Sequence, residues 1–442
     1  MSKIEDSDDS SLCEKYYTFP KPPDGHRVRT SSALNVITRN MKLNTRLLEL
    51  VPGGDVAQMT RLMREGASPN AMCRLNHVSA CHIAAMYDND ALALLLESGA
   101  DRFKSDLHGR TPLHLAAWTG NSKQILLLLN SPEGRRRTEG RFVEELPIEQ
   151  VDGLLNQPCQ PNEQFSEQDY WCGGTYHDCR TFTKRLPPFQ QGWTALHAAS
   201  ACAQHHCVQL LLAAGADASV QDLLCRTPLD VVGYAHYLGH KIDVNNFEET
   251  VKLLLNTGAK FLKNHHQNKP LDSPLHTAVE LESVAAVGLM LLNGASPTAW
   301  NRQGLTAMHI CVQKQNKELL EMLAYHEDSD GNLVLVDTED QTGSTVLCAA
   351  VKAEWMQGVR ISLDAGANIT IEKNRKSPLH IAAQLGNIDI LRKILNIAKN
   401  KTINIDYYCA DGQTALSKAI RHNHLDVVKL LLDNGFSIEA QN

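Results

Sequence analysis

Apolar residues along this chain gather in pairs of short clusters, and each pair fits two amphipathic helices joined by a turn. In the first cluster apolar positions fall at i, i+3 and i+4, as in Leu113, Ala116 and Ala117, which form one face of a helix. The second cluster is an aliphatic run, such as residues 126–129. Because the first face carries small side chains, neighbouring helices can approach closely. The pattern predicts stacked helix-turn-helix units.

Residues that start and stop helices flank both clusters. Thr111 before Pro112 supplies an N-cap hydroxyl, and proline at the first helical position gives up an N–H group that has no helical partner there. The first helix ends near Gly120, and the second closes at a Gly-Ala pair that suits a left-handed C-cap. This close recurs at Gly66, Gly99, Gly215, Gly258, Gly294 and Gly366, and before Phe436 at Gly435.

The spacing of the leucine position in the first cluster shows that these units form a period. Residues 81 and 113, 196 and 229, 275 and 308, and 347 and 379 are each 32 or 33 residues apart. The longer intervals, such as the 83 residues between positions 113 and 196, are the same period with an insertion, which belongs in a loop. The sequence therefore predicts an all-α repeat solenoid of about ten units.

At these residues the chain resembles the ankyrin-repeat family. The phrase Thr-Pro-Leu-His-Leu-Ala-Ala at 111–117, the leucine run and the Gly-Ala-Asp close all recur at a period near 33 residues. The resemblance implies helix-turn-helix units with β-hairpin tips between them. It also implies that the histidine of the phrase ties neighbouring repeats through hydrogen bonds, a role we assign to His82, His114, His197, His276, His309 and His380. The fifth and eighth units depart from the pattern, because Asp230 and Cys348 replace this histidine.

We expect four segments along the chain. Residues 1–42 form a disordered acidic tail, residues 43–130 hold repeats 1–3, residues 131–190 are a long loop insertion with a short helix near 149–155, and residues 191–442 hold repeats 4–10. Neither the tail nor the insertion is long enough for an ordinary catalytic domain. No phosphate-binding glycine loop, HExxH or GxSxG motif occurs in the sequence. We therefore expect a protein that is not an enzyme and that needs no cofactor.

Composition limits the partners. The 43 Lys and Arg residues against 50 Asp and Glu give a net charge of −7, which argues against nucleic acid as a partner. No apolar run reaches the roughly 18 residues of a membrane span, and the N-terminus lacks the features of a signal peptide, so we expect no direct membrane insertion. The 12 cysteines follow no disulfide pattern. We expect a soluble protein of the cytoplasm, with the nucleus as an alternative.

The hairpin tips before each first helix are the candidate binding site for a partner protein, because Trp and Arg are enriched at binding hot spots. The alternative is that the tips merely vary and that some apolar ones pack on the adjoining hairpin. The predicted contact residues are Leu107, His108, Arg110, Leu223, Leu224, Arg226, Trp300, Arg302, Lys373 and Arg375.

Three weaker patterns lie outside the tips. Cys159, Cys172, His177 and Cys179 have the side chains of a zinc site but no standard spacing, so we expect free thiols and no metal.

The other two patterns are candidate modification sites. Ser7 and Ser11 have the spacing of the phosphodegron of Rel-type inhibitors, but Asp8 stands where that motif has glycine, so an ordinary acidic tail is preferred. Asn70 occupies the hairpin position that an asparaginyl hydroxylase modifies in some proteins resembling this one.

The function these observations favour is a non-catalytic scaffold or adaptor that binds one or more proteins on the concave surface of the stack. Two alternatives stay open: an inhibitor that sequesters a Rel-type transcription factor, and a substrate adaptor of a ubiquitin ligase. The latter carries a C-terminal box, and no such box follows Gly435 in this sequence.

Overall fold

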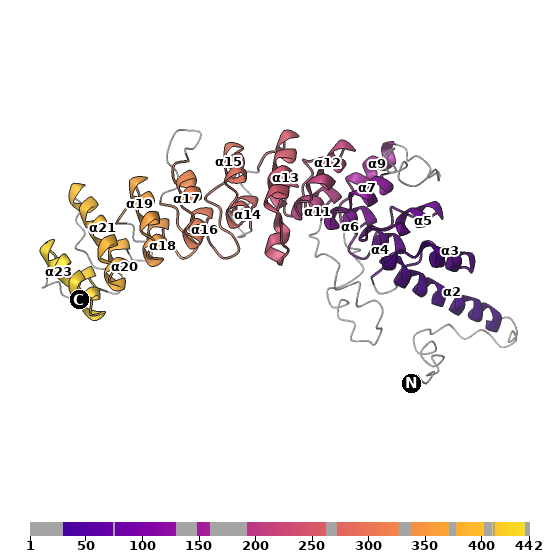
Figure 1. Cartoon of the computed structure of the whole chain (residues 1–442), viewed down its shortest axis with the longest axis horizontal. Coiled ribbons are helices and arrows are strands. Elements are labelled where there is room, and N and C mark those ends of the chain that lie inside the picture. Colours follow the sequence, from indigo (N-terminus) through magenta and orange to yellow (C-terminus); the bar gives the residue numbers. More distant parts are fainter. Residues whose placement is uncertain are drawn as a thin grey trace, which may run out of the picture.

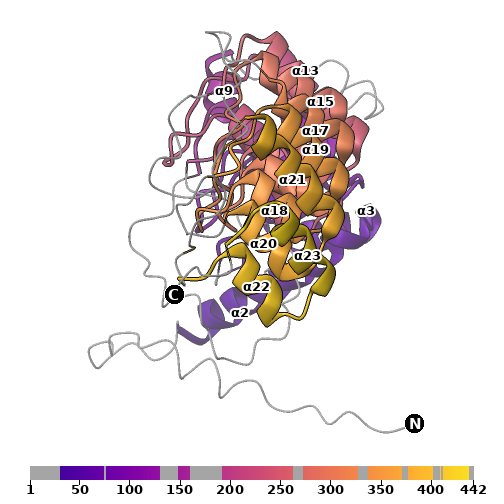
Figure 2. The same ribbon diagram turned by 90° about the vertical axis from the view of Figure 1, so that its left-hand side faces the viewer.

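The computed structural model describes residues 30–73, 76–129, 148–159, 192–261, 272–326, 337–370, 377–401, 409 and 412–437. Over these residues the chain forms ten helical units stacked side by side in one curved row, with the inner helices on its concave side (Figure 1). Viewed from the C-terminal end, helices α13 to α23 lie on one side and the loops between units on the other, whereas α9 lies on the side of the loops (Figure 2). The predicted all-α repeat solenoid is confirmed.

Each unit pairs an inner helix with an outer helix. The first five units are α2 (Thr30–Leu50) with α3 (Val56–Arg64), α4 (Ala80–Ala85) with α5 (Ala91–Glu97), α6 (Pro112–Thr119) with α7 (Ser122–Leu128), α11 (Ala195–Ala201) with α12 (His205–Ala213), and η3 (Leu229–Val231) and η4 (Tyr234–Leu238) with α13 (Val244–Asn256). The last five are α14 (Pro274–Glu280) with α15 (Val284–Leu292), α16 (Ala307–Lys314) with α17 (Lys317–Ala324), α18 (Val346–Lys352) with α19 (Met356–Asp364), α20 (Pro378–Leu385) with α21 (Ile388–Asn400), and α22 (Ala415–Arg421) with α23 (Leu425–Asp433). A 3-10 turn η1 (Val51–Gly53) joins α2 to α3, and α9 (Ile148–Leu155) follows α7.

The helix signals in the sequence act as expected. Thr111 caps α6 with Pro112 at the first helical position, and Gly120 ends the helix in the left-handed region at φ 81°. The glycines that close the outer helices, such as Gly99 and Gly215, also have positive φ. A left-handed backbone favours glycine because any other side chain strains there.

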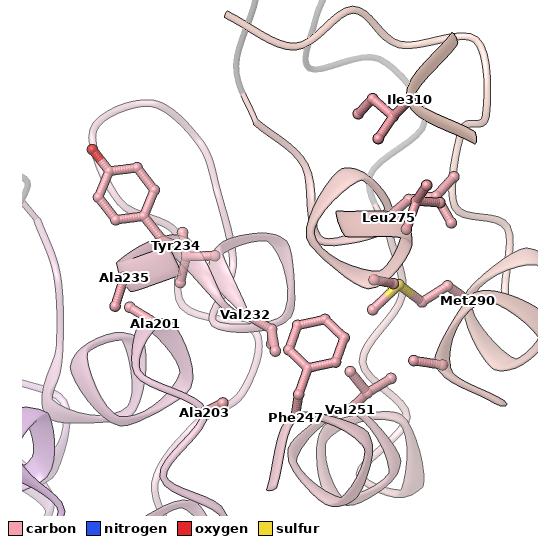
Figure 3. Packing of buried hydrophobic residues seen from close by; sticks show 14 of the residues in the cluster. Ala201, Ala203, Val232, Tyr234, Ala235, Phe247, Val251, Leu275, Met290 and Ile310 are labelled. Atoms are coloured by element: carbon pink, nitrogen blue, oxygen red, sulfur yellow. The ribbon is translucent and has the colours of Figure 1, made fainter. Parts of the chain in front are cut away.

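The core runs unbroken along the row of units. Leu113, Ala116 and Ala117 are fully buried between neighbouring inner helices, as their spacing predicts. Farther along, the ring of Phe247 in α13 lies beside Val232 and Val251, where unit 5 meets unit 6 (Figure 3). Each unit therefore buries its apolar faces on its two neighbours, as expected of a solenoid.

The first predicted boundary was wrong. Helix α2 begins at Thr30, well inside the segment expected to be a disordered tail, and continues to Leu50. Its C-terminal part joins the core through Leu47, which is fully buried. The remainder of the expected tail, residues 1–29, lies outside the described residues.

The segment predicted as one long insertion is in fact two. Helix α9 confirms the short helix expected there, and its Leu154 and Leu155 are fully buried. The N–H of Cys159 donates to the carbonyl oxygen of Trp193 at 2.8 Å, and the N–H of Gly192 donates to that of Cys159 at 2.7 Å. These bonds hold Cys159 beside Gly192 and Trp193, so the described residues 148–159 divide the segment that the sequence predicted as one insertion.

Unit 5 has no inner α-helix. Two 3-10 turns, η3 and η4, stand in its place, separated by Val232 at φ −56° and ψ 126° and Gly233 at φ 78° and ψ 6°, the angles of a type II turn. Two adjacent β-branched valines followed by glycine disfavour a continuous α-helix. This unit also carries extra residues between η3 and its outer helix α13.

Candidate protein-binding surface

The hairpin tips are held rigid by one acidic or amide side chain at their first position. In the tip formed by residues 222–226, Oδ1 of Asp222 accepts hydrogen bonds from the N–H groups of Leu224 at 2.9 Å and Arg226 at 2.8 Å. Asp106, Asn301 and Asp340 do the same in the tips at 106–110, 301–305 and 340–344. A side chain on such a tip is therefore presented on a fixed backbone.

Two of the predicted contact residues are not on the surface, and this part of the prediction was wrong. Arg110 and Arg226 are only 3% and 4% exposed. Each guanidinium pairs with the first residue of its own tip, with 2.6 Å between Nη2 and the carboxylate oxygen of Asp106 or Asp222. The arginine neutralises a buried carboxylate, so it holds the tip together and leaves no group for a partner.

Three other predicted residues are exposed. Leu223 is 64% exposed and Leu224 is 38% exposed, next to each other on the 222–226 tip. Trp300 is 42% exposed, although its indole Nε1–H donates to the carbonyl oxygen of Glu339 at 2.8 Å. Exposed aliphatic and aromatic groups on a rigid tip are typical of interaction surfaces.

Leu107 and His108 are half-buried on the 106–110 tip. Burial lowers the pKa of His108 below its ordinary value, so the imidazole is neutral near pH 7. The exposed surface of this tip is uncharged, and it is smaller than that of the 222–226 tip.

Arg302 faces back along the stack rather than outward. Its Nε lies 3.1 Å from Oδ2 of Asp272, its Nη2 donates to the Tyr234 hydroxyl at 2.8 Å, and its guanidinium lies 5.3 Å from the centre of the Tyr234 ring. The side chain is 44% exposed, so one side of it remains open to solvent. The Arg302 side chain therefore mainly connects neighbouring repeats, and only its solvent-exposed edge is accessible to a partner protein.

A buried aromatic group next to these tips was not predicted. Trp193 donates from Nε1 to Oδ2 of Asp222 at 3.1 Å, and the Tyr234 ring meets it edge-on at 5.6 Å. The Arg226 guanidinium lies beside both rings, 5.9 Å from the Trp193 ring centre and 5.8 Å from that of Tyr234. The sequence pattern that could have predicted this group is the Asp-x-x-x-Arg spacing, which is repeated in the 106–110 and 222–226 tips.

Neighbouring units are bridged by the recurring histidines His82, His114, His197, His276 and His309, as the resemblance implied. The Thr194 N–H donates to Nδ1 of His197 at 3.1 Å, so Nδ1 carries no proton and Nε2–H donates to the carbonyl oxygen of Arg226 at 3.0 Å. His82, His114 and His276 make the same two bonds. In each, Nδ1 accepts from the N–H three residues earlier, and Nε2–H donates to a carbonyl oxygen of the next unit, that of Arg110, Trp193 or Ala299. In unit 5, Asp230 accepts from the N–H and hydroxyl of Thr227 instead.

The remaining predicted residues divide between described and undescribed parts of the chain. Lys373, Arg375, Ser7, Ser11, Cys172, His177 and Cys179 lie outside the described residues. Cys159 is buried, and burial raises the pKa of its thiol. Across the described segments, no cluster of three His, Cys, Asp or Glu side chains could hold a metal ion.

Asn70 is engaged with the next unit. Its Oδ1 accepts from the Asp101 N–H at 2.8 Å, and its Nδ2 donates to the carbonyl oxygen of Gly99 at 3.4 Å. Asn156 accepts from the Asp217 N–H in the same way, at 3.1 Å. Modification of Asn70 stays a prediction, because these bonds describe only its structural role.

Stacked units, bridging histidines and rigid tips define a repeat solenoid whose surface is built for contact with other macromolecules. The family profile "Ankyrin repeats (3 copies)" matches residues 47–136, 241–334, 331–405 and 359–442, and the profile "Ankyrin repeat" matches residues 191–223. The chain belongs to the ankyrin-repeat family.

Curated relatives match only part of the chain. The chain is 28% identical to human "Transient receptor potential cation channel subfamily A member 1" over 181 residues, which are 40% of this chain and 16% of that protein. It is 29% identical to human "B-cell lymphoma 3 protein" over 177 residues, 40% of this chain and 38% of that protein. The chain therefore spans well under half the length of either relative.

Among solved structures, the crystal structure of the ankyrin repeat domain of Bcl-3, described as a unique member of the IkappaB protein family, is similar to this chain. The two are 25% identical, with a TM-score of 0.39, over 47% of this chain and 87% of that one. In the described part of the chain, every helix is too short or too polar to span a lipid bilayer.

Proposed function

We propose that this protein is a non-catalytic scaffold that binds partner proteins through its hairpin tips and the adjoining inner helices. The observation that carries the proposal is the pair Leu223 and Leu224, exposed side by side on a tip whose backbone is fixed by Asp222. A rigid site loses little conformational entropy on binding, so exposed apolar area there contributes efficiently to affinity.

The binding residues we propose are Leu107, His108, Leu223, Leu224 and Trp300, with the outer edge of Arg302. Lys373 and Arg375 belong to the same proposal from their place in the sequence alone. The partner is a protein, and no cofactor takes part. The site of action is the cytoplasm or the nucleus, which fits the cysteines of the described segments being free thiols.

The test is a quantitative affinity purification from native lysate with the intact chain and with a Leu223→Asp, Trp300→Asp double variant. Gln303→Asp is the control for each single replacement, because it adds one negative charge to an exposed position of the 301–305 tip. We expect a stoichiometric partner on the intact chain and the control, reduced at least tenfold on the double variant. Equal recovery on all three would remove the tips from the proposal.

A second candidate is an inhibitor that sequesters a Rel-type transcription factor. It is favoured by the similarity to B-cell lymphoma 3 protein over 177 residues, since Bcl-3 is described as a member of the IkappaB family. The altered motif at Ser7 and Ser11 argues against regulated turnover of that kind. A titration of the intact chain with a purified Rel-homology dimer tests this function. A Kd of 10 µM corresponds to a binding free energy on the order of 7 kcal/mol, and the absence of binding at that concentration would exclude the function.

A further inference from the structure

One position of the inner helices changes character along the stack. It is the seventh residue after the Thr or Ser at which the inner helix or turn of each unit starts. In units 2–5 this residue is apolar or aromatic and at least half-buried: Met86, Trp118, Ala201 and Tyr234. In units 7–10 it is polar and exposed: Gln313, Lys352, Gln384 and Arg421. We call these last four residues the donor ladder, because each presents N–H groups and none is acidic.

The inner helices of units 7–10 carry positive charge only. Helices α16, α18, α20 and α22 contain no Asp or Glu, and their cations are Lys314, Lys352, Lys418 and Arg421. Lys418 is buried, and the other three cations are exposed. The outer helices of the same units carry both signs in equal number. Positive charge therefore gathers on the inner side of these units, although the whole chain has a net charge of −7.

The two cations of the donor ladder lie in the angle between inner helix and hairpin tip. Nζ of Lys352 donates to Oγ of Ser344 at 3.0 Å. Nη2 of Arg421 donates to the amide oxygen of Gln413 at 2.9 Å, with that amide in the orientation that satisfies both groups. Ser344 and Gln413 each precede the N-cap of their helix, so the two contacts are equivalent. Both cations thus face the concave side, along which the inner helices follow one another (Figure 1), and their acceptors are uncharged.

The acidic side chains near the donor ladder are engaged by groups of the protein itself. Asp272 and Glu280 each pair with a cation of unit 7, at 3.1 Å and 3.3 Å. Asp340 accepts from N–H groups of its own tip, and Glu354 accepts from an asparagine of the next unit at 3.1 Å. The tip before unit 9 lies outside the described residues, and its sequence, Glu-Lys-Asn-Arg-Lys at 372–376, adds three cations to one acid. An excess of positive charge therefore remains over units 7–10.

The exposed apolar groups of the tips precede this charge along the stack. Leu223 and Leu224 are exposed on the tip of unit 5, and Trp300 is exposed at the tip of unit 7. A segment that runs along the concave side from unit 5 to unit 10 meets the apolar groups first and the cations afterwards. Packed helices of adjacent units lie about 8–10 Å apart, so the five steps measure about 40–50 Å, which about 15 extended residues span.

We infer that the partner contributes an extended acidic peptide segment, with leucine or aromatic residues at one end that dock on Leu223 and Leu224 and with Asp or Glu residues that pair with Lys352 and Arg421. This inference rests on the proposed function, because the 222–226 tip is the anchor. Carboxylates form charge-assisted hydrogen bonds with Lys and Arg, and the amides of the ladder donate to them as well. In a polyproline II segment every third side chain lies on one face, about 9 Å apart, which matches the spacing of the units. The separation of apolar and charged groups sets the direction in which the segment lies.

The experiment uses the full chain and a phage library of random 16-residue peptides as the probe. Selected peptides are synthesised with a fluorescent label, and their affinity is measured by fluorescence polarisation. The first variant is the double charge reversal Lys352→Glu, Arg421→Glu. Its matched control is Arg360→Glu, Arg392→Glu, which makes the same change in net charge at exposed positions of the outer helices α19 and α21. Circular dichroism and the thermal midpoint establish that both variants are folded.

Two further measurements separate the charged part of the site from its apolar anchor. Leu223→Asp, with Gln303→Asp as the control, tests the anchor. Titration of the intact chain at about 50 mM and about 300 mM NaCl tests the charge without any substitution, because salt screens exposed ion pairs.

The expected peptides are richer in Asp and Glu than the library. They should lose at least tenfold in affinity on the double reversal and at least tenfold on Leu223→Asp, and less than twofold on either control. The higher salt concentration should weaken their binding to the intact chain at least fivefold.

Peptides that show no acidic enrichment, or that bind the double reversal and the intact chain equally, would overturn the acidic segment. If they still lost affinity on Leu223→Asp, the proposed function would stand without this inference. Peptides that depend on the ladder but not on Leu223 would overturn the tip as the anchor and the proposed function with it. Displacement of the peptides by a 16-residue oligothymidylate at the same Kd would make the ladder a general polyanion site and overturn the inference. Failure to select any peptide would overturn both proposals.

Discussion

His114 and Trp193 are 79 residues apart in the sequence, yet the imidazole Nε2–H of the first donates to the carbonyl oxygen of the second at 3.0 Å. The bond joins unit 3 to unit 4 across both insertions. Its geometry matches the bond between His197 and Arg226, whose units follow each other without an insertion. The stacking of units thus survives about 50 inserted residues, because each unit recognises its neighbour through the same histidine.

Replacing His114 by leucine should destabilise the junction of units 3 and 4. The change leaves the N–H of Thr111 buried without its partner. It also removes one of the two hydrogen bonds at the carbonyl oxygen of Trp193, which keeps the bond from the N–H of Cys159, so the total cost is about 2 kcal/mol. Hydrogen exchange of the amides in α6 and α11 measures the local loss. His206→Leu on α12 is the control, because His206 is exposed. Equal protection in the two variants would contradict the bridging role.

Acid should destabilise the stack before it protonates most carboxylates. Burial lowers the pKa of His114 and of His197 to about 4, below the 6.5 that an unfolded chain has. Below pH 6.5 the unfolded state therefore binds more protons than the folded state. The stability that the neutral imidazoles contribute is fully present above that pH and is lost as the pH falls toward 4. The loss is about 2 kcal/mol for each histidine at pH 5.

Urea unfolding between pH 7.5 and pH 5 measures this dependence. The intact chain should lose stability steadily over that interval, and the His114→Leu variant should show a smaller slope because it has one buried imidazole fewer. A stability that stays constant from pH 7.5 to pH 5 would contradict the assignment.

Arg226 and Leu223 lie three residues apart on one tip but should respond in opposite ways to replacement. Arg226→Met leaves the carboxylate of Asp222 buried without its cation and should cost about 3 kcal/mol of stability. Leu223→Asp changes a side chain that is mostly in water, so the unfolding free energy should shift by less than about 0.5 kcal/mol while partner binding falls. Thermal unfolding and the affinity purification together separate the two roles. If Arg226→Met left the thermal midpoint unchanged, the ion pair would not be holding the tip.

The sequence was sufficient for the architecture because the signals are local and repeated. The hydroxyl and proline that start α6, the glycine that ends it and the period of its leucine each specify one feature of a unit. Stacking then follows from burying the small-residue face, so the helix pairs could be predicted in order.

The errors arose where the structure depends on contacts between distant residues. Arg110 and Arg226 were expected on the surface because they lie in tips, and only the repeated aspartate four residues earlier hinted at a buried pair. The division of the insertion by α9 depends on the bonds between Cys159 and Trp193, which sequence spacing does not reveal. The edge-on contact between the rings of Trp118 and His240 is of the same kind, since the two residues are 122 positions apart in the sequence.

One backbone position offers a test that uses two units of the same protein. The residue that follows the inner helix is left-handed in both unit 7 and unit 9, where it is Gln315 at φ 53° and Gly386 at φ 80°. Gln315 is exposed, so replacing it by glycine relieves backbone strain at no cost in packing and should stabilise the protein by about 0.5–1 kcal/mol.

The reverse change in unit 9 should be harmful for two reasons. Alanine at position 386 would strain the same left-handed backbone, and its Cβ would collide with the imidazole of His424, whose Nε2 hydrogen-bonds to the carbonyl oxygen of Gln384 at 3.0 Å. We expect Gly386→Ala to cost about 2 kcal/mol or more, since strain and a displaced interrepeat bond add. Thermal unfolding of both variants beside the intact chain should therefore show a rise for one and a fall for the other. If Gln315→Gly lowered the thermal midpoint, the Gln315 side chain would make a contact that stabilises the protein by more than the backbone strain costs. Positions 315 and 386 would then differ in packing as well as in residue type.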